Sequence, residues 1–148
     1  MLSERFKGYD LSSFYNQLRT RDKEVGVVFG THTLLSNSRL ALMASEFARD
    51  QGRHDLFHEN MFHAYFTEGL DIGKPDVIAN IAVKSGLDKK ETLSAVRDGR
   101  YASRLNEARK EGQLIGLTGV PLFIINNKHQ ITGAQPIETF RNLLDKIK

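Results

Sequence analysis

The stretch that decides the fold is Gly119-Val120-Pro121-Leu122-Phe123-Ile124-Ile125. A Gly-Val-Pro turn leads directly into four consecutive apolar residues. A strand with one face in water alternates apolar and polar residues, so this run predicts an interior strand that is covered on both faces. Asn126-Asn127 favours a tight turn with positive φ angles, and residues 128–131 return as a second strand. Pro136 then starts a last predicted helix.

Upstream of this hairpin, apolar residues recur at helical spacing. A first helical face carries Leu11, Phe14, Tyr15 and Leu18, and Val25 to Gly30 is predicted to be extended. Five further helices are expected, over residues 37–50, 54–66, 75–86, 88–99 and 101–114. Many helices followed by one hairpin and a helix predict an α-rich α/β chain.

Local signals support several of these helices. Asp88, with Glu91 three residues later, has the pattern of a capping box, and Gly86 is a natural C-cap. The second of the five helices should bury an apolar face that comprises Phe57, Met61, Ala64 and Tyr65. Asn60 lies among these apolar residues, so we expect it to be a buried polar group with a hydrogen-bonded partner.

Composition excludes several classes of function. The chain has 148 residues, a net charge of +3 and no cysteine. It therefore forms no disulfide, no thiolate nucleophile and no cysteine-ligated metal site. The charges are spread along the chain and no apolar run approaches membrane-spanning length, so we expect neither a nucleic acid nor a membrane as partner. The charged start of the sequence does not resemble a signal peptide, which predicts a cytoplasmic protein. No nucleotide-binding glycine pattern occurs, and we expect no cofactor.

The polar side chains give no catalytic or metal site. Asp50, His54 and His58 share a helical stripe that could bind zinc or nickel weakly. No His-Glu-x-x-His pattern accompanies it, so we interpret the stripe as a solvated face. The dense aromatics around Phe62 and Phe66 could line a groove, but core packing explains them better.

Three segments carry a resemblance to a known family: Ser36 to Ala41, Met61 to Gly73, and Gly116 to Ile125 followed by Ile131 to Pro136. In this order and spacing they resemble the DsbA family of thioredoxin-fold proteins, and specifically its FrnE-like branch. The matches extend from about Val27 to Ile147. The 2-hydroxychromene-2-carboxylate isomerases and the kappa-class glutathione transferases are similar in layout.

The resemblance implies one DsbA-like domain, with a helical insertion at about 31–116 and the C-terminal ββα half of the thioredoxin fold at about 117–148. It also implies a substrate loop formed by Thr118, Gly119, Val120 and Pro121, with a cis bond before the proline. In the family this loop faces a Cys-x-x-Cys motif and offers backbone groups to an extended substrate.

The sequence departs from the family at its start. The family begins with a βαβ unit that contains Cys-x-x-Cys and needs about 30 residues or more. Only residues 1–24 precede the first matching part, so we expect an incomplete thioredoxin-like fold without this unit. The strand at 122–125 would then lack its neighbour and expose a hydrogen-bonding edge. We expect a second copy of the chain to pair with it and form a homo-oligomer, or Val25 to Phe29 to fold back against it.

Three functions remain open, and whether the chain is an enzyme remains open with them. The first is a DsbA/FrnE-like member of the disulfide oxidoreductase family that is inactive in thiol–disulfide exchange, because exchange requires a thiolate. The second is a non-catalytic module that binds a peptide or a partner subunit. The third is the remnant of a glutathione-dependent enzyme similar to the 2-hydroxychromene-2-carboxylate isomerases.

Overall fold

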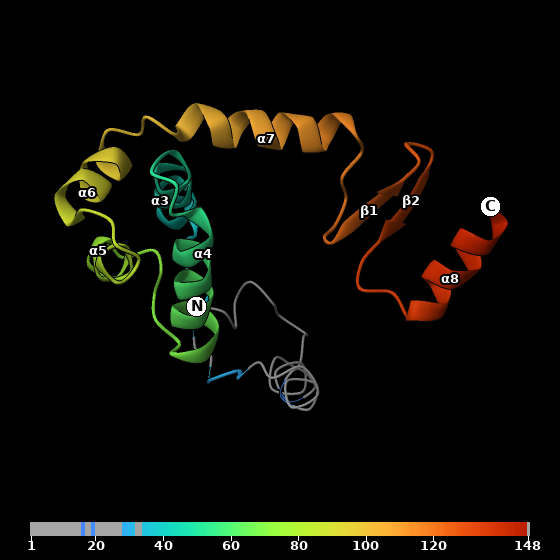
Figure 1. Ribbon diagram of the computed structural model, residues 1–148, viewed down its shortest axis with the longest axis horizontal. Coiled ribbons are helices and arrows are strands. Elements are labelled where there is room, and N and C mark those ends of the chain that lie inside the picture. Colours follow the sequence, from blue (N-terminus) through green and yellow to red (C-terminus); the bar gives the residue numbers. More distant parts are fainter. Residues whose placement is uncertain (1–15, 17–18, 20–27, 32–33, 148) are drawn as a thin grey trace. The chain divides into compact units, whose positions relative to one another are not determined.

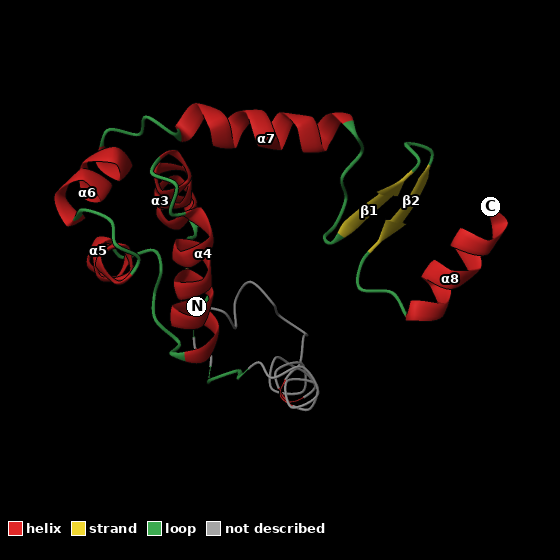
Figure 2. Cartoon of the chain, viewed as in Figure 1, coloured by secondary structure: helices red, strands yellow, loops and turns green. Residues whose placement is uncertain are grey.

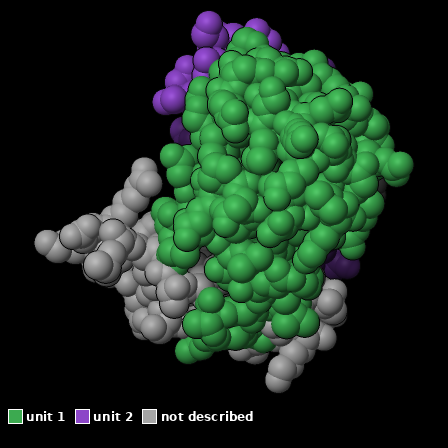
Figure 3. Space-filling model, turned by 90° about the vertical axis from the view of Figure 1, so that its left-hand side faces the viewer, with its two compact units in different colours: residues 1–105 green, residues 106–148 purple. Residues whose placement is uncertain are grey.

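The computed structural model describes residues 16, 19, 28–31 and 34–147. The helical face predicted around residues 11–18 and most of the extended segment predicted from Val25 lie outside this range. Residues 28–31 form no strand. The described chain divides into two compact units, residues 1–105 and 106–148 (Figure 3). The division between residues 105 and 106 falls within the helix Ala102–Leu114.

The first unit consists of helices and the loops between them (Figures 1 and 2). They are α3 (Arg39–Asp50), α4 (His54–Phe62), the π-helical turn η1 (His63–Thr67), α5 (Pro75–Lys84) and α6 (Lys89–Arg97). α3 packs against α4, α5 and α6, and α5 packs against α4 and α6. α7 (Ala102–Leu114) begins in this unit and ends in the second. Among the described residues, no helix is both long and apolar enough to cross a membrane.

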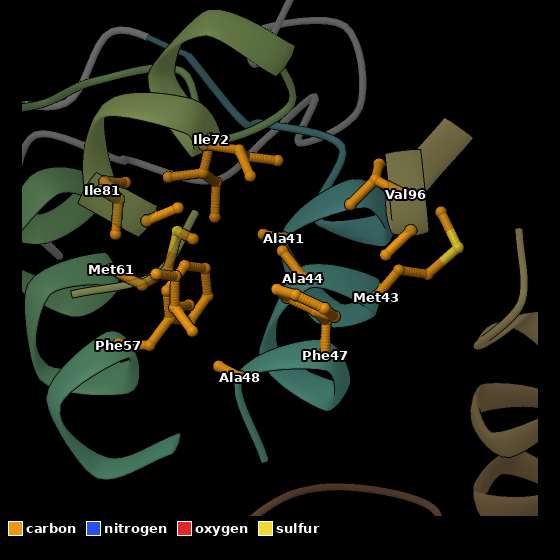
Figure 4. Close-up of a cluster of buried hydrophobic side chains, with 14 of the residues drawn as sticks. Ala41, Met43, Ala44, Phe47, Ala48, Phe57, Met61, Ile72, Ile81 and Val96 are labelled. Atoms are coloured by element: carbon orange, nitrogen blue, oxygen red, sulfur yellow. The ribbon is translucent and has the colours of Figure 1, made fainter. Parts of the chain in front are cut away.

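A core of small and large apolar side chains holds the helical unit together. Phe57 and Ile78 are fully buried, and each such burial is worth roughly 1.5–3 kcal/mol. Figure 4 shows Phe57 and Met61 of α4 facing the side of α3 that carries Ala44. Because the alanines of α3 are small, the two helices can pack closely there.

The predicted caps are present. Asp88 accepts a hydrogen bond from the Glu91 amide at 2.8 Å and so caps α6. Gly86 has a φ of +74° just beyond α5, as expected of a C-cap. Asn60 has a hydrogen-bonded partner, as expected. Its side-chain amide donates to the Ser85 hydroxyl at 3.0 Å. Ser85 is fully buried and also donates to the Ile81 carbonyl at 2.8 Å.

One helical prediction needs correction. The helix expected over 54–66 is α-helical only to Phe62 and continues as η1, in which the Glu68 amide donates to the His63 carbonyl at 3.0 Å. The extra residue per turn widens the helix locally, which apolar spacing does not reveal. In α7, Leu105 packs against the core, whereas Leu114 is 86% exposed.

Residues 28–31 form hydrogen bonds with the π turn η1. The Gly30 amide donates to the Phe66 carbonyl at 2.8 Å, and Thr67 Oγ1 donates to the Val28 carbonyl at 2.7 Å. A Cβ added to Gly30 would lie 2.1 Å from the Thr67 carbonyl oxygen. Only glycine therefore allows the two backbones to come this close.

The second unit contains the hairpin and the last helix. β1 (Leu122–Ile125) pairs antiparallel with β2 (His129–Thr132), and α8 spans Ile137–Lys146. Asn126 and Asn127 have φ angles of 51° and 54°, which confirms the predicted turn. The sheet formed by the described residues has two strands, so β2 is the one strand that pairs with β1 among them. Which segment or molecule pairs with β1 stays a prediction.

Candidate functional site

The loop Thr118–Pro121 is set up by the end of α7. The Leu117 amide donates to the Gly112 carbonyl at 2.8 Å, and the Gly116 amide donates to the Gln113 carbonyl at 3.1 Å. Gly116 has a φ of +70°, a conformation that glycine adopts without the strain of a side chain. These contacts close the helix and direct the chain into the loop.

The four loop residues lie together at the start of β1. Thr118, Val120 and Pro121 are exposed, and Val120 retains 79% of its accessible surface. The Val120–Pro121 peptide bond is cis. The Pro121 carbonyl accepts a hydrogen bond from the Gly133 amide at 2.8 Å, which fixes the end of the loop to the residue after β2. The loop therefore presents Val120 to solvent from a fixed base.

The register of the hairpin decides where the backbone of β1 points. Pro121 and Gly133 occupy facing positions joined by a hydrogen bond, and Phe123 faces Ile131. In an antiparallel ladder, hydrogen-bonded positions alternate with positions whose amide and carbonyl groups point away from the partner strand. Leu122 and Ile124 are the alternate positions. Their backbone groups are therefore directed to the outer edge of β1, beside the exposed loop.

Both faces of β1 are partly exposed. The Phe123 ring contacts the Phe140 ring of α8 edge-on, with 4.9 Å between centroids. Phe123 nevertheless remains 41% exposed. Leu122 and Ile124 point to the opposite face, and Ile124 is 44% exposed. An exposed apolar face next to outward-directed backbone groups can accept an additional strand.

Residues after β2 fix the end of the hairpin. Gln135 Nε2 donates to the Thr132 carbonyl at 3.0 Å, and the Gln135 amide donates to the Gly133 carbonyl at 2.9 Å. Gly133 has a φ of +85°. This turn ends β2 and leads the chain to Pro136, which precedes α8. Residues 116–125 and 131–136, the third segment of the resemblance, therefore form the exposed loop, β1, the end of β2 and the turn before α8.

The other two segments of the resemblance meet in the helical unit. A Cβ on Gly73 would lie 3.1 Å from the Asn37 carbonyl oxygen, so the backbones at 37 and 73 are in close contact. The Ser36 hydroxyl and the Gly73 amide hold the pKa of Asp71 below its ordinary value. The Gly73 amide lies 3.0 Å from Asp71 Oδ1. The buried Ser36 Oγ has no hydrogen bond of good geometry with a described residue. The hydrogen bond from the Gly73 amide is therefore the better-defined of the two contacts to Asp71. These residues support the fold of the helical unit.

The histidine stripe does not form a metal site. His54 and His58 stack with 5.6 Å between ring centroids. Asp50 turns instead to Arg104 and Tyr101, at 2.8 Å and 2.9 Å. Hydrogen bonds from these two residues lower the pKa of Asp50. No group of three metal-ligating side chains occurs among the described residues.

The aromatics around Phe62 and Phe66 form a row along α4 and η1. His58 lies 4.3 Å from Phe62, and Phe62 lies 5.3 Å from Phe66, measured between ring centroids. Phe66 also meets Phe29 edge-on at 5.8 Å. The spacing of four residues between these rings places them along one side of the helix. Core packing, which we preferred for these aromatics, holds for the buried Phe57 but not for Phe62, which is 50% exposed.

Comparisons with known proteins agree on the architecture. The family model described as "DSBA-like thioredoxin domain" matches residues 12–145 of this chain. The uncharacterized protein YwbO of Bacillus subtilis is 28% identical over 106 residues, which cover 71% of this chain and 52% of that protein. A thiol:disulfide interchange protein DsbA of Pseudomonas aeruginosa is 26% identical over 91 residues, which cover 60% of this chain and 43% of that protein. The chain thus spans about half the length of these curated relatives.

A solved structure shows the same fold. The probable DsbA oxidoreductase from Streptomyces coelicolor superposes with a TM-score of 0.82 and 22% sequence identity. The match covers 99% of this chain and 64% of that one. The fold is therefore a DsbA-like thioredoxin fold, and the expectation of an α-rich α/β chain is confirmed.

Proposed function

We propose that residues 118–125 of this chain, which belongs to the family of DSBA-like thioredoxin domains, bind an extended polypeptide. We also propose that the chain itself does not catalyse thiol–disulfide exchange. The observation that carries the proposal is the outer edge of β1. Leu122 and Ile124 direct backbone groups away from β2, next to the exposed Val120. An extended peptide can add to such an edge as a further strand, with main-chain hydrogen bonds supplying affinity.

The composition supports the second half of the proposal. Thiol–disulfide exchange proceeds by attack of a thiolate on a disulfide sulfur. The 148 residues contain no cysteine. We therefore expect the purified chain to reduce insulin no faster than buffer with the same reductant, while a Cys-x-x-Cys thioredoxin run in parallel is active. Insulin reduction above the buffer rate would refute this part of the proposal.

Peptide binding is tested with backbone modification. A labelled valine–threonine repeat peptide should bind the chain, as followed by fluorescence anisotropy. Methylation of every second backbone nitrogen removes the amide donors on one edge of the peptide. One of the two alternate methylation patterns should weaken binding about ten-fold, because it removes bonds worth about 1 kcal/mol each. Equal binding by both methylated peptides and the parent would exclude pairing at a strand edge.

A second copy of the chain competes for the same edge. We propose that the free chain forms a homo-oligomer through β1 at high concentration, because an unpaired edge with apolar neighbours favours pairing. The two occupants should exclude each other, so peptide should shift the chain toward monomer in light scattering. A stable monomer at micromolar concentration without peptide would contradict the oligomer and leave peptide binding intact.

Assignment to the FrnE-like branch is part of the same proposal. Its support is the segment Met61 to Gly73, which forms the end of α4, the π turn η1 and the loop that follows. At the end of that segment the Gly73 amide donates to Asp71, and the Gly73 backbone lies close to that of Asn37.

A further inference from the structure

We propose that a cleft between η1, α5 and the start of α6 binds a small molecule with an apolar body and one carboxylate group. The cleft has a volume of about 500 Å³ and is lined by residues between Ala64 and Lys89. All of these residues belong to the helical unit. The proposal is therefore independent of the loop at 118–121 and of peptide binding.

The floor of the cleft is apolar and belongs to the core. Ala64 and Ile81 are each 3% exposed and belong to the hydrophobic core, and Val77 packs against that core. Figure 4 places Ile81 among the core side chains. A pocket of this size with an apolar floor and a few polar groups is typical of sites for small molecules.

The polar groups at the rim favour an anion. Lys84 and Lys89 supply two ammonium groups, and Glu68 supplies one carboxylate. Glu68 Oε1 lies 3.8 Å from Lys84 Nζ and 3.3 Å from His63 Nδ1. Lys89 forms no ion pair or side-chain hydrogen bond with a described residue. Its ammonium group is therefore available to a ligand carboxylate, while Glu68 is occupied within the rim.

This arrangement selects by charge as well as by shape. An apolar body can cover Val77 and Ile81, and its carboxylate can reach Lys89. A neutral molecule of the same shape keeps the apolar contact and loses the ion pair. Because the rim is partly exposed to water, the ion pair should contribute a modest factor that decreases with added salt.

The test uses 4-phenylbutyrate, its neutral amide and the corresponding amine, each titrated into the full chain and followed by backbone amide NMR. We expect saturable shifts at residues around Val77 and Ile81, with the carboxylate binding at least about three-fold more tightly than the amide. Lys89→Gln should remove this difference. Lys90→Gln changes the adjacent exposed lysine, which does not line the cleft, and should leave it unchanged.

Two further variants act in opposite directions. Glu68→Gln removes the only carboxylate of the described cleft lining and should tighten 4-phenylbutyrate binding. Asn80→Trp fills the cleft from an exposed lining position and should abolish binding without disturbing the core. Each proposed step can therefore fail separately. Absence of saturable shifts, equal binding of carboxylate and amide, or equal effects of K89Q and K90Q would overturn the proposal.

Discussion

Tyr101, at the start of α7, donates its hydroxyl to Asp50, at the end of α3, with 2.9 Å between the oxygens. Arg104, in the first turn of α7, binds the same carboxylate at 2.8 Å and lies over the Tyr101 ring at 5.1 Å. The Tyr101 ring also meets Phe47 edge-on, with 6.4 Å between centroids. The Asp50 carboxylate, which we had interpreted as part of a solvated helical face, therefore attaches the first turn of α7 to α3.

Replacing Tyr101 by phenylalanine removes the hydroxyl and keeps the ring. Tyr101 is 6% exposed, so its hydrogen bond is shielded in part from water. We expect Tyr101→Phe to lower the free energy of unfolding by about 1 kcal/mol. Urea denaturation followed by circular dichroism measures this change. An unchanged midpoint would mean that the hydroxyl does not stabilise the attachment of α7.

The same attachment should depend on pH. Arg104 and Tyr101 lower the pKa of Asp50 from its ordinary value of 3.8. A carboxyl group with a depressed folded-state pKa contributes stability above its unfolded pKa, and this contribution is lost as the pH falls through the folded value. The difference in unfolding free energy between the native chain and Asp50→Asn should be constant from neutral pH to near 4 and decrease below 3.8. A difference that stays constant in acid would show that Asp50 is not held by its charge.

The hydrogen bond from Asn60 to the fully buried Ser85 gives a prediction in the core. Ser85→Ala removes the acceptor of the Asn60 side-chain amide, and Asn60 itself is only partly buried. Because water can reach part of Asn60, the loss should cost about 1 kcal/mol in unfolding free energy. Ser94→Ala, on the exposed side of α6, is the matched control and should change stability by less than about 0.5 kcal/mol. Equal effects of the two substitutions would contradict the assignment.

The hairpin turn offers a stabilising change. Asn127 has a φ of +54°, a region that glycine adopts more readily than any residue with a side chain. Asn127→Gly creates the Asn-Gly pair that hairpin turns prefer, and it should strengthen the β1–β2 pairing. Asn127→Ala should weaken it. Hydrogen exchange of the Lys128 amide, which donates to the Ile125 carbonyl at 3.1 Å, reports both changes. Faster exchange in the glycine variant would show that the turn does not limit pairing.

Local sequence signals predicted the elements and could not predict their long-range partners. The Asp88 cap and the Asn126-Asn127 turn depend on residues within a few positions of each other, and both are present. The need of Asn60 for a partner was predictable, but the partner lies 25 positions away in sequence. Tyr101 and Asp50 are 51 positions apart, and polar residues on a helix ordinarily face water.

The candidate site was predicted in the same partial way. The loop Thr118 to Pro121 was predicted from the family resemblance that Gly116 to Ile125 carries. The outward direction of the Leu122 and Ile124 backbone groups could not be predicted, because it depends on the register with β2. The apolar run itself predicted an interior strand, and β2 is the one strand that pairs with β1 among the described residues. Hydrophobicity indicates that a strand needs cover and does not identify what covers it.

The central claim is that the outer edge of β1 receives an extended peptide, and backbone amide NMR of the full chain tests it most directly. On titration with the valine–threonine peptide, the amides of Leu122 and Ile124 should shift and become protected from hydrogen exchange. The amides of Phe123 and Ile131, which face each other within the hairpin, should change little. Protection that does not alternate along β1, or that is confined to β2, would contradict the claim.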